Sequence, residues 1–192
     1  MFDTNVCSSD SCVPLLIQQN VDGFDSFNRS WAEFKVGFND TRGNYWLGND
    51  LLSQLTLNGR YKLRFDLQLN ANLSWYWAEY SSFIVSSEAS SYMVAVSGYS
   101  GNIGDAFGAH NRMMFTTYDR DNDRWNNNAY KNNCAVYNGG GFWYYGCSWC
   151  NVNGVRGRGD HFRWHTPQTG DIHLQTSRMW LTCSLHWLSR FL

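Results

Sequence analysis

Apolar and polar residues alternate along the segment from Tyr61 to Leu69, which reads YKLRFDLQL. An apolar residue at every second position is typical of a strand that is buried on one face. The preceding Asn58-Gly59 pair is a turn signal, and the apolar segments 75–85 and 92–96 are the expected partners of this strand. An antiparallel sheet is therefore predicted in the first half of the chain.

Two short helices are predicted before this sheet. Ser30 and Glu33 have the spacing of a capping box, and Gly37 is placed to end the helix that they begin. A second helix is expected from Asn49 or Asp50 to Leu55. After position 98 Gly, Asn and Asp dominate, which predicts long loops that disulfides or ions must hold. The fold class predicted is α+β.

Composition and charge exclude several classes of protein. The 192 residues suit one domain, and 17% are aromatic while only 16% are charged. A net charge of −1 argues against non-specific nucleic-acid binding, which needs a basic face. No apolar run approaches the roughly 20 residues of a membrane-spanning helix. Six cysteines and the glycosylation sequons at Asn28, Asn39 and Asn72 predict a secreted protein, although no signal peptide is visible after Met1.

Candidate chemistry is concentrated in an acidic loop with Asp119, Asp121 and Asp123. Alternate carboxylates in a tight loop are the oxygen ligands that calcium prefers. An EF-hand does not fit, because Arg124 and Tyr130 stand where its glycine and its bidentate glutamate belong. The alternative is a solvated acidic turn whose side chains cap backbone groups.

Cysteines follow this loop. Cys134 and Cys147 bracket a turn rich in glycine and aromatic residues, which suggests a disulfide loop. A rival interpretation is a zinc site, because Cys147-x2-Cys150 and His161-x3-His165 approximate a two-cysteine, two-histidine spacing. The gap between the two pairs is shorter than that of a zinc finger.

An ordered series of motifs resembles the fibrinogen C-terminal (fibrinogen-related) domain family between about Leu16 and about His161. The matching segments are Asp22-Gly23, Phe27-Asn-Arg-Ser-Trp31, Tyr45-Trp-Leu-Gly-Asn-Asp50, Gly98-Tyr-Ser-Gly-Asn102, His110-Asn111, the acidic loop, Asn133-Cys-Ala135, Trp143-Tyr144 and Asn151-Val-Asn-Gly154. The resemblance implies a central antiparallel sheet, short helices and a long loop-rich region that binds calcium and ligand. It also implies a secreted or cell-surface module. Many members are lectins for acetylated sugars, of an innate-immune type, and others are receptor ligands or matrix proteins.

The resemblance assigns individual residues. It implies a calcium site made by the side chains of Asp121 and Asp123 and the carbonyls of Trp125 and Asn127, and a Cys134–Cys147 disulfide. It places an acetyl-binding pocket beside the second cysteine, after a cis Gly146–Cys147 peptide bond. The expected ligand-binding residues are Asn138, Tyr145, Gly146, Cys147, Ser148 and Trp149. Ser148 departs from the family, which has histidine there. His110 lies in a family motif and is expected to pack or to form hydrogen bonds rather than to catalyse.

We therefore expect calcium-dependent extracellular recognition of acetylated glycans or glycoproteins, with no enzymatic activity. A cell-surface receptor and a second copy of the chain are further partners that the resemblance allows. The first alternative is a structural or receptor-binding module that does not bind sugar. The second is a non-functional truncated fragment. The Arg158-Gly159-Asp160 tripeptide matches an integrin motif, but three-residue matches are frequent by chance.

Both ends depart from the family pattern. The predicted organisation is a divergent segment 1–15, an incomplete fibrinogen-like domain 16–161 and a divergent tail 162–192. We hypothesise that the tail is frameshifted, because Arg163-Trp164-His165 can be encoded so that the next reading frame gives the family's Asp-Gly-Ile. If the family's terminal strands are missing, the sheet would expose edges that promote aggregation.

Overall fold

The computed structural model describes residues 13–57, 61–126, 132–147, 149–157 and 161–183. Its helices are α1 (Trp31–Val36), α2 (Asn49–Thr56) and α3 (Cys134–Asn138), with 3-10 turns η1 (Asp25–Phe27), η2 (Glu88–Ser90) and η3 (Phe107–His110). Its strands are β1 (Leu15–Asn20), β2 (Phe38–Asn39), β3 (Tyr45–Trp46), β4 (Tyr61–Leu69), β5 (Trp75–Val85), β6 (Val94–Gly101), β7 (Cys150–Asn151), β8 (Arg163–Thr166) and β9 (Gly170–Cys183).

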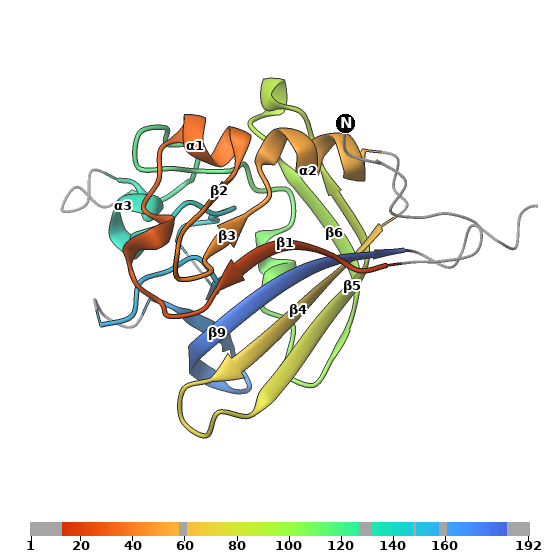
Figure 1. Cartoon of the computed structure of the whole chain (residues 1–192), viewed down its shortest axis with the longest axis vertical. Helices are drawn as coiled ribbons and strands as arrows, with labels where there is room; N and C mark the ends of the chain where they lie inside the picture. Colours follow the sequence, from red (N-terminus) through yellow and green to blue (C-terminus); the bar gives the residue numbers. More distant parts are fainter. Residues whose placement is uncertain (1–12, 58–60, 127–131, 148, 158–160, 184–192) are drawn as a thin grey trace, which may run out of the picture.

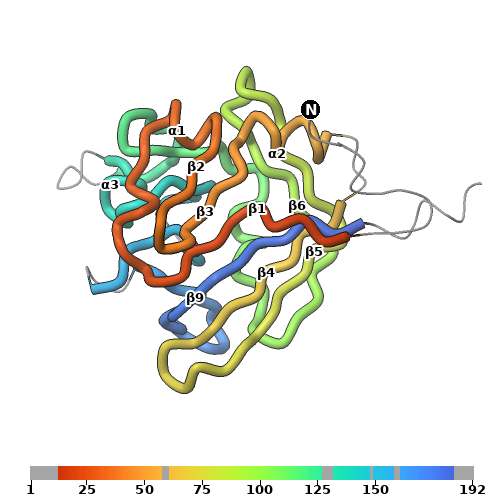
Figure 2. The backbone as a smooth tube through the Cα atoms, in the orientation of Figure 1, coloured from red at the N-terminus to blue at the C-terminus, as the bar shows by residue number. Residues whose placement is uncertain are grey.

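These strands form one antiparallel sheet within the described part of the chain. Its order is β2-β3-β1-β9-β4-β5-β6, with β8 pairing β9 and β7 pairing β8 beside that path. In Figure 1 the long strands form a twisted sheet, with α1 and α2 at one end and α3 among the loops at one side. The tube in Figure 2 shows how β1 and β9, from opposite ends of the chain, run side by side. The predicted α+β class and central antiparallel sheet are confirmed.

Period-two alternation predicted β4 well. The strand runs from Tyr61 to Leu69, and its residues alternate between buried and partly exposed positions up to Leu67. The partner β5 also has the predicted bounds. The third strand was predicted over 92–96 but extends from Val94 to Gly101. Tyr92 cannot begin it, because its φ of 48° is left-handed, whereas Gly98 tolerates a φ of 73° and lets pairing with β5 continue.

Local sequence signals also placed the helices. The Ser30 hydroxyl accepts a hydrogen bond from the Glu33 backbone N–H, and the Glu33 carboxylate accepts one from the Ser30 backbone N–H. Gly37 follows α1 with a φ of 91°, which a residue with a Cβ rarely adopts. The second helix begins at Asn49 as predicted and ends one residue after Leu55. The capping box and both predicted helices are therefore confirmed.

The end of the chain enters the centre of the sheet. β9 lies between β1 and β4, with Leu181 pairing Leu15 on one side and Leu63 on the other. Met179 and Leu181 are fully buried, and Cys183 is disulfide-bonded. The anticipated loss of central strands is therefore wrong for the described residues.

Aromatic rings fill the space between the sheet and the loops. Trp143 is fully buried and contacts the rings of Trp46, Phe115 and Phe107 at centroid distances of 6.0, 5.1 and 6.0 Å. Such ring pairs add specific edge-to-face contacts to the burial of large apolar surfaces. This packing fixes the loops that carry the candidate site. No helix in the described part of the chain is long and apolar enough to cross a bilayer.

Candidate metal and ligand site

A disulfide anchors the start of α3. Cys134 is bonded to Cys147, with a Cα–Cα distance of 5.1 Å, so the predicted pairing is confirmed. The preceding Asn133 caps the helix, because its side-chain oxygen accepts hydrogen bonds from the backbone N–H groups of Ala135 and Val136. The Asn133 amide also donates to the Thr117 carbonyl at 2.9 Å. The helix therefore begins at a point that is fixed both to the disulfide and to the segment before the acidic loop.

Asp123 is the central side chain of the acidic loop. Its Oδ1 accepts a hydrogen bond from the Trp125 N–H, and its Oδ2 accepts one from the Cys134 N–H, each at 2.8 Å. Asp121 Oδ1 accepts from the Asp123 N–H at 3.2 Å. Burial raises the pKa of Asp123 to about 6, and the neighbouring Asp121 charge adds to the rise, against the two backbone donors. A cation at this place would remove the electrostatic cost of two close carboxylates.

The acidic loop is hydrogen-bonded to the segment that contains the second cysteine. The Arg124 N–H donates to the Tyr145 carbonyl at 3.0 Å, and the Tyr145 N–H donates to the Cys147 carbonyl at 3.1 Å. Together with the Asp123–Cys134 bond and the disulfide, these contacts make the loop and the 145–147 segment one unit. Asp123 and the exposed Tyr145 therefore belong to the same hydrogen-bonded part of the structure.

The protein-family model for the fibrinogen beta and gamma chains, C-terminal globular domain, matches residues 7–189.

This chain belongs to the fibrinogen C-terminal domain family.

Individual proteins that are similar in sequence to this fibrinogen-like domain support the family assignment. The fibrinogen alpha chain of Rattus norvegicus is 44% identical over 156 residues, which cover 73% of this chain and 19% of that protein. Angiopoietin-related protein 2 of Homo sapiens is 41% identical over 152 residues, covering 77% of this chain and 29% of that protein. The chain thus spans less than half of the length of either relative.

Solved structures share the fold. The fibrinogen-like globe domain of human ANGPTL2 superposes with a TM-score of 0.76 and 36% identity, over 90% of this chain and 81% of that one. A lamprey fibrin D-dimer in complex with a Gly-His-Arg-Pro-amide peptide gives a TM-score of 0.74 and 27% identity, over 88% and 61%. The family match over 7–189 also extends beyond the span of 16–161 that the motifs indicated. The chain is a fibrinogen-like globular domain.

The predicted metal ligands fit a hard cation in part. Asp121 and Asp123 lie together, and Trp125 follows them in the same loop, while Asn127 lies outside the described residues. Asp119 is committed elsewhere, because its Oδ1 accepts from the Trp31 N–H at 2.9 Å and from the Thr117 hydroxyl at 2.7 Å. Over the described ranges, no three His, Cys, Asp or Glu side chains converge. A cation would therefore need backbone carbonyls beside the two aspartates, which is the ligand set that the resemblance implies.

The predicted ligand-binding residues divide into two groups. Tyr145, Gly146 and Trp149 reach the surface, and the Tyr145 and Trp149 side chains are 50% and 37% exposed. Cys147 is buried in the disulfide. Asn138 is only 1% exposed, and its amide donates to the Cys134 carbonyl at 2.8 Å, so it stabilises α3 and does not reach the surface. Ser148 lies outside the described residues.

The expected cis peptide bond is absent. No cis bond occurs among the described residues, which include Gly146 and Cys147, so this prediction is wrong for this structure. A non-proline cis bond costs about 3 kcal/mol and needs surroundings that enforce it. No neighbouring atom lies within 4 Å of the place where a Gly146 Cβ would stand, so packing at this glycine does not enforce a cis bond.

The zinc interpretation is also wrong. Cys147 is bonded to Cys134 in the disulfide, so its sulfur is not available as a thiolate ligand, and the Cys150 thiol is fully buried. The His161 ring packs against Tyr137 at 4.4 Å, and His165 Nδ1 lies 3.0 Å from Asp171. The Arg158-Gly159-Asp160 tripeptide lies outside the described residues.

Sequence reasoning missed a buried polar cluster that holds the loops to the sheet. The Gln18 amide on β1 donates to the Val152 carbonyl and to Asn153 Oδ1, each at 3.0 Å. Asn153 in turn donates to the Gly141 carbonyl at 2.9 Å, between the two bridged cysteines. The motif Asn151-Val-Asn153-Gly154 was recognised only as a family marker, because nothing in the sequence indicates which distant strand meets its amides.

Proposed function

We propose that this domain is a calcium-dependent extracellular recognition module that binds an acetylated glycan or glycoprotein beside the Cys134–Cys147 disulfide. One observation carries the proposal. The Asp123 carboxylate accepts a hydrogen bond from the Cys134 N–H, so the candidate ion ligand and the disulfide share one contact. Ion binding and the shape of the neighbouring surface are therefore coupled through a path of a few bonds.

Different residues would bind the calcium ion and the ligand. Asp121, Asp123 and the carbonyls of Trp125 and Asn127 would hold calcium, which supplies positive charge that fixes the loop. The exposed rings of Tyr145 and Trp149 offer flat apolar faces, and such faces stack on the C–H side of sugar rings. Gly146 is exposed and has no side chain, so a ligand could approach the backbone at that residue. The peptide-bound lamprey fibrin D-dimer supports binding as the role of a domain with this fold.

Calcium binding is tested first, on the folded and oxidised chain, by titration calorimetry. Asp123→Asn should abolish the binding heat, because an amide replaces the carboxylate and its NH2 group faces the Cys134 N–H. The matched control is Asp25→Asn, which changes an exposed aspartate in η1 and should leave calcium binding unchanged. A wild-type protein that is folded and oxidised but takes up no calcium would refute the proposal.

Ligand binding is tested second, by retention on a resin that carries N-acetylglucosamine. We expect retention in calcium, elution by EDTA, and reduced retention of Trp149→Ala. The buried position of Asn138 favours one alternative, a structural or receptor-binding module that uses other surfaces. Calcium uptake without any retention on the acetylated resin would select that alternative.

A further inference from the structure

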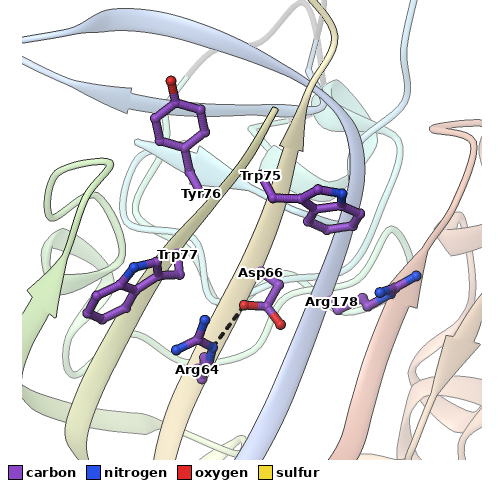
Figure 3. Close-up of a pocket in the computed structure, with 6 residues that line it drawn as sticks. All are labelled: Arg64, Asp66, Trp75, Tyr76, Trp77 and Arg178. Atoms are coloured by element: carbon purple, nitrogen blue, oxygen red, sulfur yellow. Dashed lines mark hydrogen bonds and ion pairs between the residues drawn. The ribbon is translucent and has the colours of Figure 1, made fainter. Parts of the chain in front are cut away.

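A second candidate site lies on the solvent-facing side of the sheet, away from the acidic loop. A hollow of about 260 Å³ lies over β4, β5 and β9, and Figure 3 draws the side chains that line it. Strand register places three of its residues side by side across the sheet, because Asp66 on β4 pairs with Trp77 on β5 and with Arg178 on β9. The residues that line it are Arg64, Asp66, Trp75, Tyr76, Trp77 and Arg178. Tyr76 extends away from the other five side chains, so those five define the groove (Figure 3).

Two arginine–indole pairs form the walls of this groove. The Arg178 guanidinium lies 5.0 Å from the Trp75 ring centroid, and the Arg64 guanidinium lies 5.0 Å from the Trp77 ring centroid. Stacking on an aromatic face holds a guanidinium in place, so less side-chain freedom is lost when it binds a ligand. Trp75 nevertheless remains 45% exposed. The groove therefore presents preorganised cations together with an accessible indole.

The charges in the groove are unequal. Arg64 Nε donates to Asp66 Oδ1 at 2.8 Å, and this ion pair is neutral overall. Arg178 Nε donates to Gln19 Oε1 at 2.9 Å, and an amide does not neutralise it. Arg178 forms no ion pair with any carboxylate in the described part of the chain. The two terminal nitrogens of Arg178 therefore favour a ligand with one negative charge, since two parallel N–H donors match the two oxygens of a carboxylate.

We infer that the groove binds an acidic pyranose of the hexuronate type. The sugar carboxylate would meet Arg178, its C–H face would lie on Trp75, and its hydroxyl groups would donate to Asp66. The hollow is smaller than the roughly 300–1,000 Å³ of sites for drug-sized ligands, so it suits one sugar ring. An acidic peptide fits less well, because the Arg64 charge is already paired with Asp66 and Arg178 can serve only one carboxylate.

The probe is methyl β-D-glucuronide, which has one carboxylate and no acetyl group, and methyl β-D-glucoside is its neutral counterpart. Binding is followed by the indole N–H signals in NMR spectra of the full chain. The buffer contains EDTA, so that the proposed calcium-dependent site does not contribute. We expect saturable binding of the glucuronide with a Kd in the millimolar range. The glucoside should bind at least about tenfold more weakly, because the charge-assisted hydrogen bonds are lost.

Variants test the assignment. Arg178→Gln should weaken the glucuronide to the level of the glucoside without changing glucoside binding, whereas Trp75→Ala should weaken both sugars. Trp75 is exposed, so that variant should fold even if the β9 variant does not. The matched controls are Phe24→Ala and Arg42→Gln, another exposed ring with a guanidinium 5.4 Å from its centroid, and both should bind as wild type.

The inference is overturned by any one of three results. These are no saturable shift with the glucuronide, equal affinity for the neutral glucoside, and unchanged binding in both groove variants. Tighter binding of a tri-glutamate peptide than of the glucuronide would also overturn it and would assign the groove to acidic peptides. Because the measurement is made without calcium, its outcome is independent of the acetylated-ligand proposal.

Discussion

His110 should make the domain lose stability between pH 6.5 and pH 4. Its side chain is fully buried, Nδ1 lies 2.6 Å from the Trp143 carbonyl, and Nε2 accepts a hydrogen bond from the Cys150 N–H at 3.1 Å. The carbonyl can only accept, so Nδ1 carries the proton and Nε2 does not. A second proton on Nε2 would face the Cys150 N–H, where it has no acceptor. The imidazole is therefore suited to remain neutral, as the expectation of a packing and hydrogen-bonding role implied.

The magnitude follows from the shifted pKa. Burial lowers the pKa of His110 from an ordinary 6.5 to about 4. The unfolded chain then binds more protons than the folded chain between these values, so stability is full above pH 6.5 and falls as the pH falls. At about 1.36 kcal/mol per pKa unit, the free energy of unfolding is lower than at neutral pH by about 2 kcal/mol at pH 5 and by about 3 kcal/mol below pH 4.

The assay is urea unfolding of wild type and His110→Gln at several pH values from 7 to 4. A glutamine keeps a polar group near the Cys150 N–H but does not titrate, so the variant should be less stable at pH 7 and should lack the 2 kcal/mol decrease at pH 5. Asp123, with a pKa of about 6, contributes a slope of opposite sign that cancels in the comparison. His173→Gln, at an exposed position of β9, is the control. Equal pH slopes for wild type and His110→Gln would refute the reasoning.

Two further predictions concern stability. Ser30→Ala should lower the free energy of unfolding by about 1 kcal/mol because the capping box is lost, whereas Ser87→Ala, at an N-cap with no side-chain hydrogen bond, should change it little; urea unfolding distinguishes these, and equal effects would contradict the cap assignment. Replacing Cys134 and Cys147 together by serine should cost about 3 kcal/mol, because the bridge closes a loop between residues 13 apart in sequence; an unchanged thermal midpoint would show that the bridge does not stabilise the fold.

The sequence was most informative where a local rule acts alone. The strand from Tyr61 to Leu69 has one face in the core and one in solvent, so period-two alternation marks it. Ser30 and Glu33 satisfy each other within one turn of helix, so α1 needs no distant partner to begin. The Cys134–Cys147 bridge and the family also followed from residues close together in sequence. These features could be predicted because their sequence signals are local, although β4 itself pairs with the distant β9.

Prediction from the sequence failed where contacts between distant residues decide which positions are buried. β9 buries the successive residues Thr176 and Ser177, and its register with β4 shifts just before them, so strict alternation does not mark the strand. β1 buries Gln18, whose amide is satisfied only by residues more than 130 positions away. Polar residues at such positions look like loop residues until the partner is known. The outer groove was missed for the same reason, since Arg178 and Trp75 meet only through the sheet.

The two candidate sites depend differently on the hypothesis of a frameshifted tail. The acidic loop, the disulfide and Tyr145 all precede position 162, so the proposed calcium ligands do not depend on the frame of the last 31 residues, although Trp149 packs against His165 of that tail. The groove needs Arg178, which belongs to that tail, and its neighbour Met179 packs into the core from the same strand. Sequencing the coding DNA therefore separates the two sites. If the downstream frame carries the family's Asp-Gly-Ile, the parent protein has a different residue opposite Asp66, and the uronate groove belongs to this chain alone. If the downstream frame lacks those words, the cation opposite Asp66 is native, and a binding function can have been selected there.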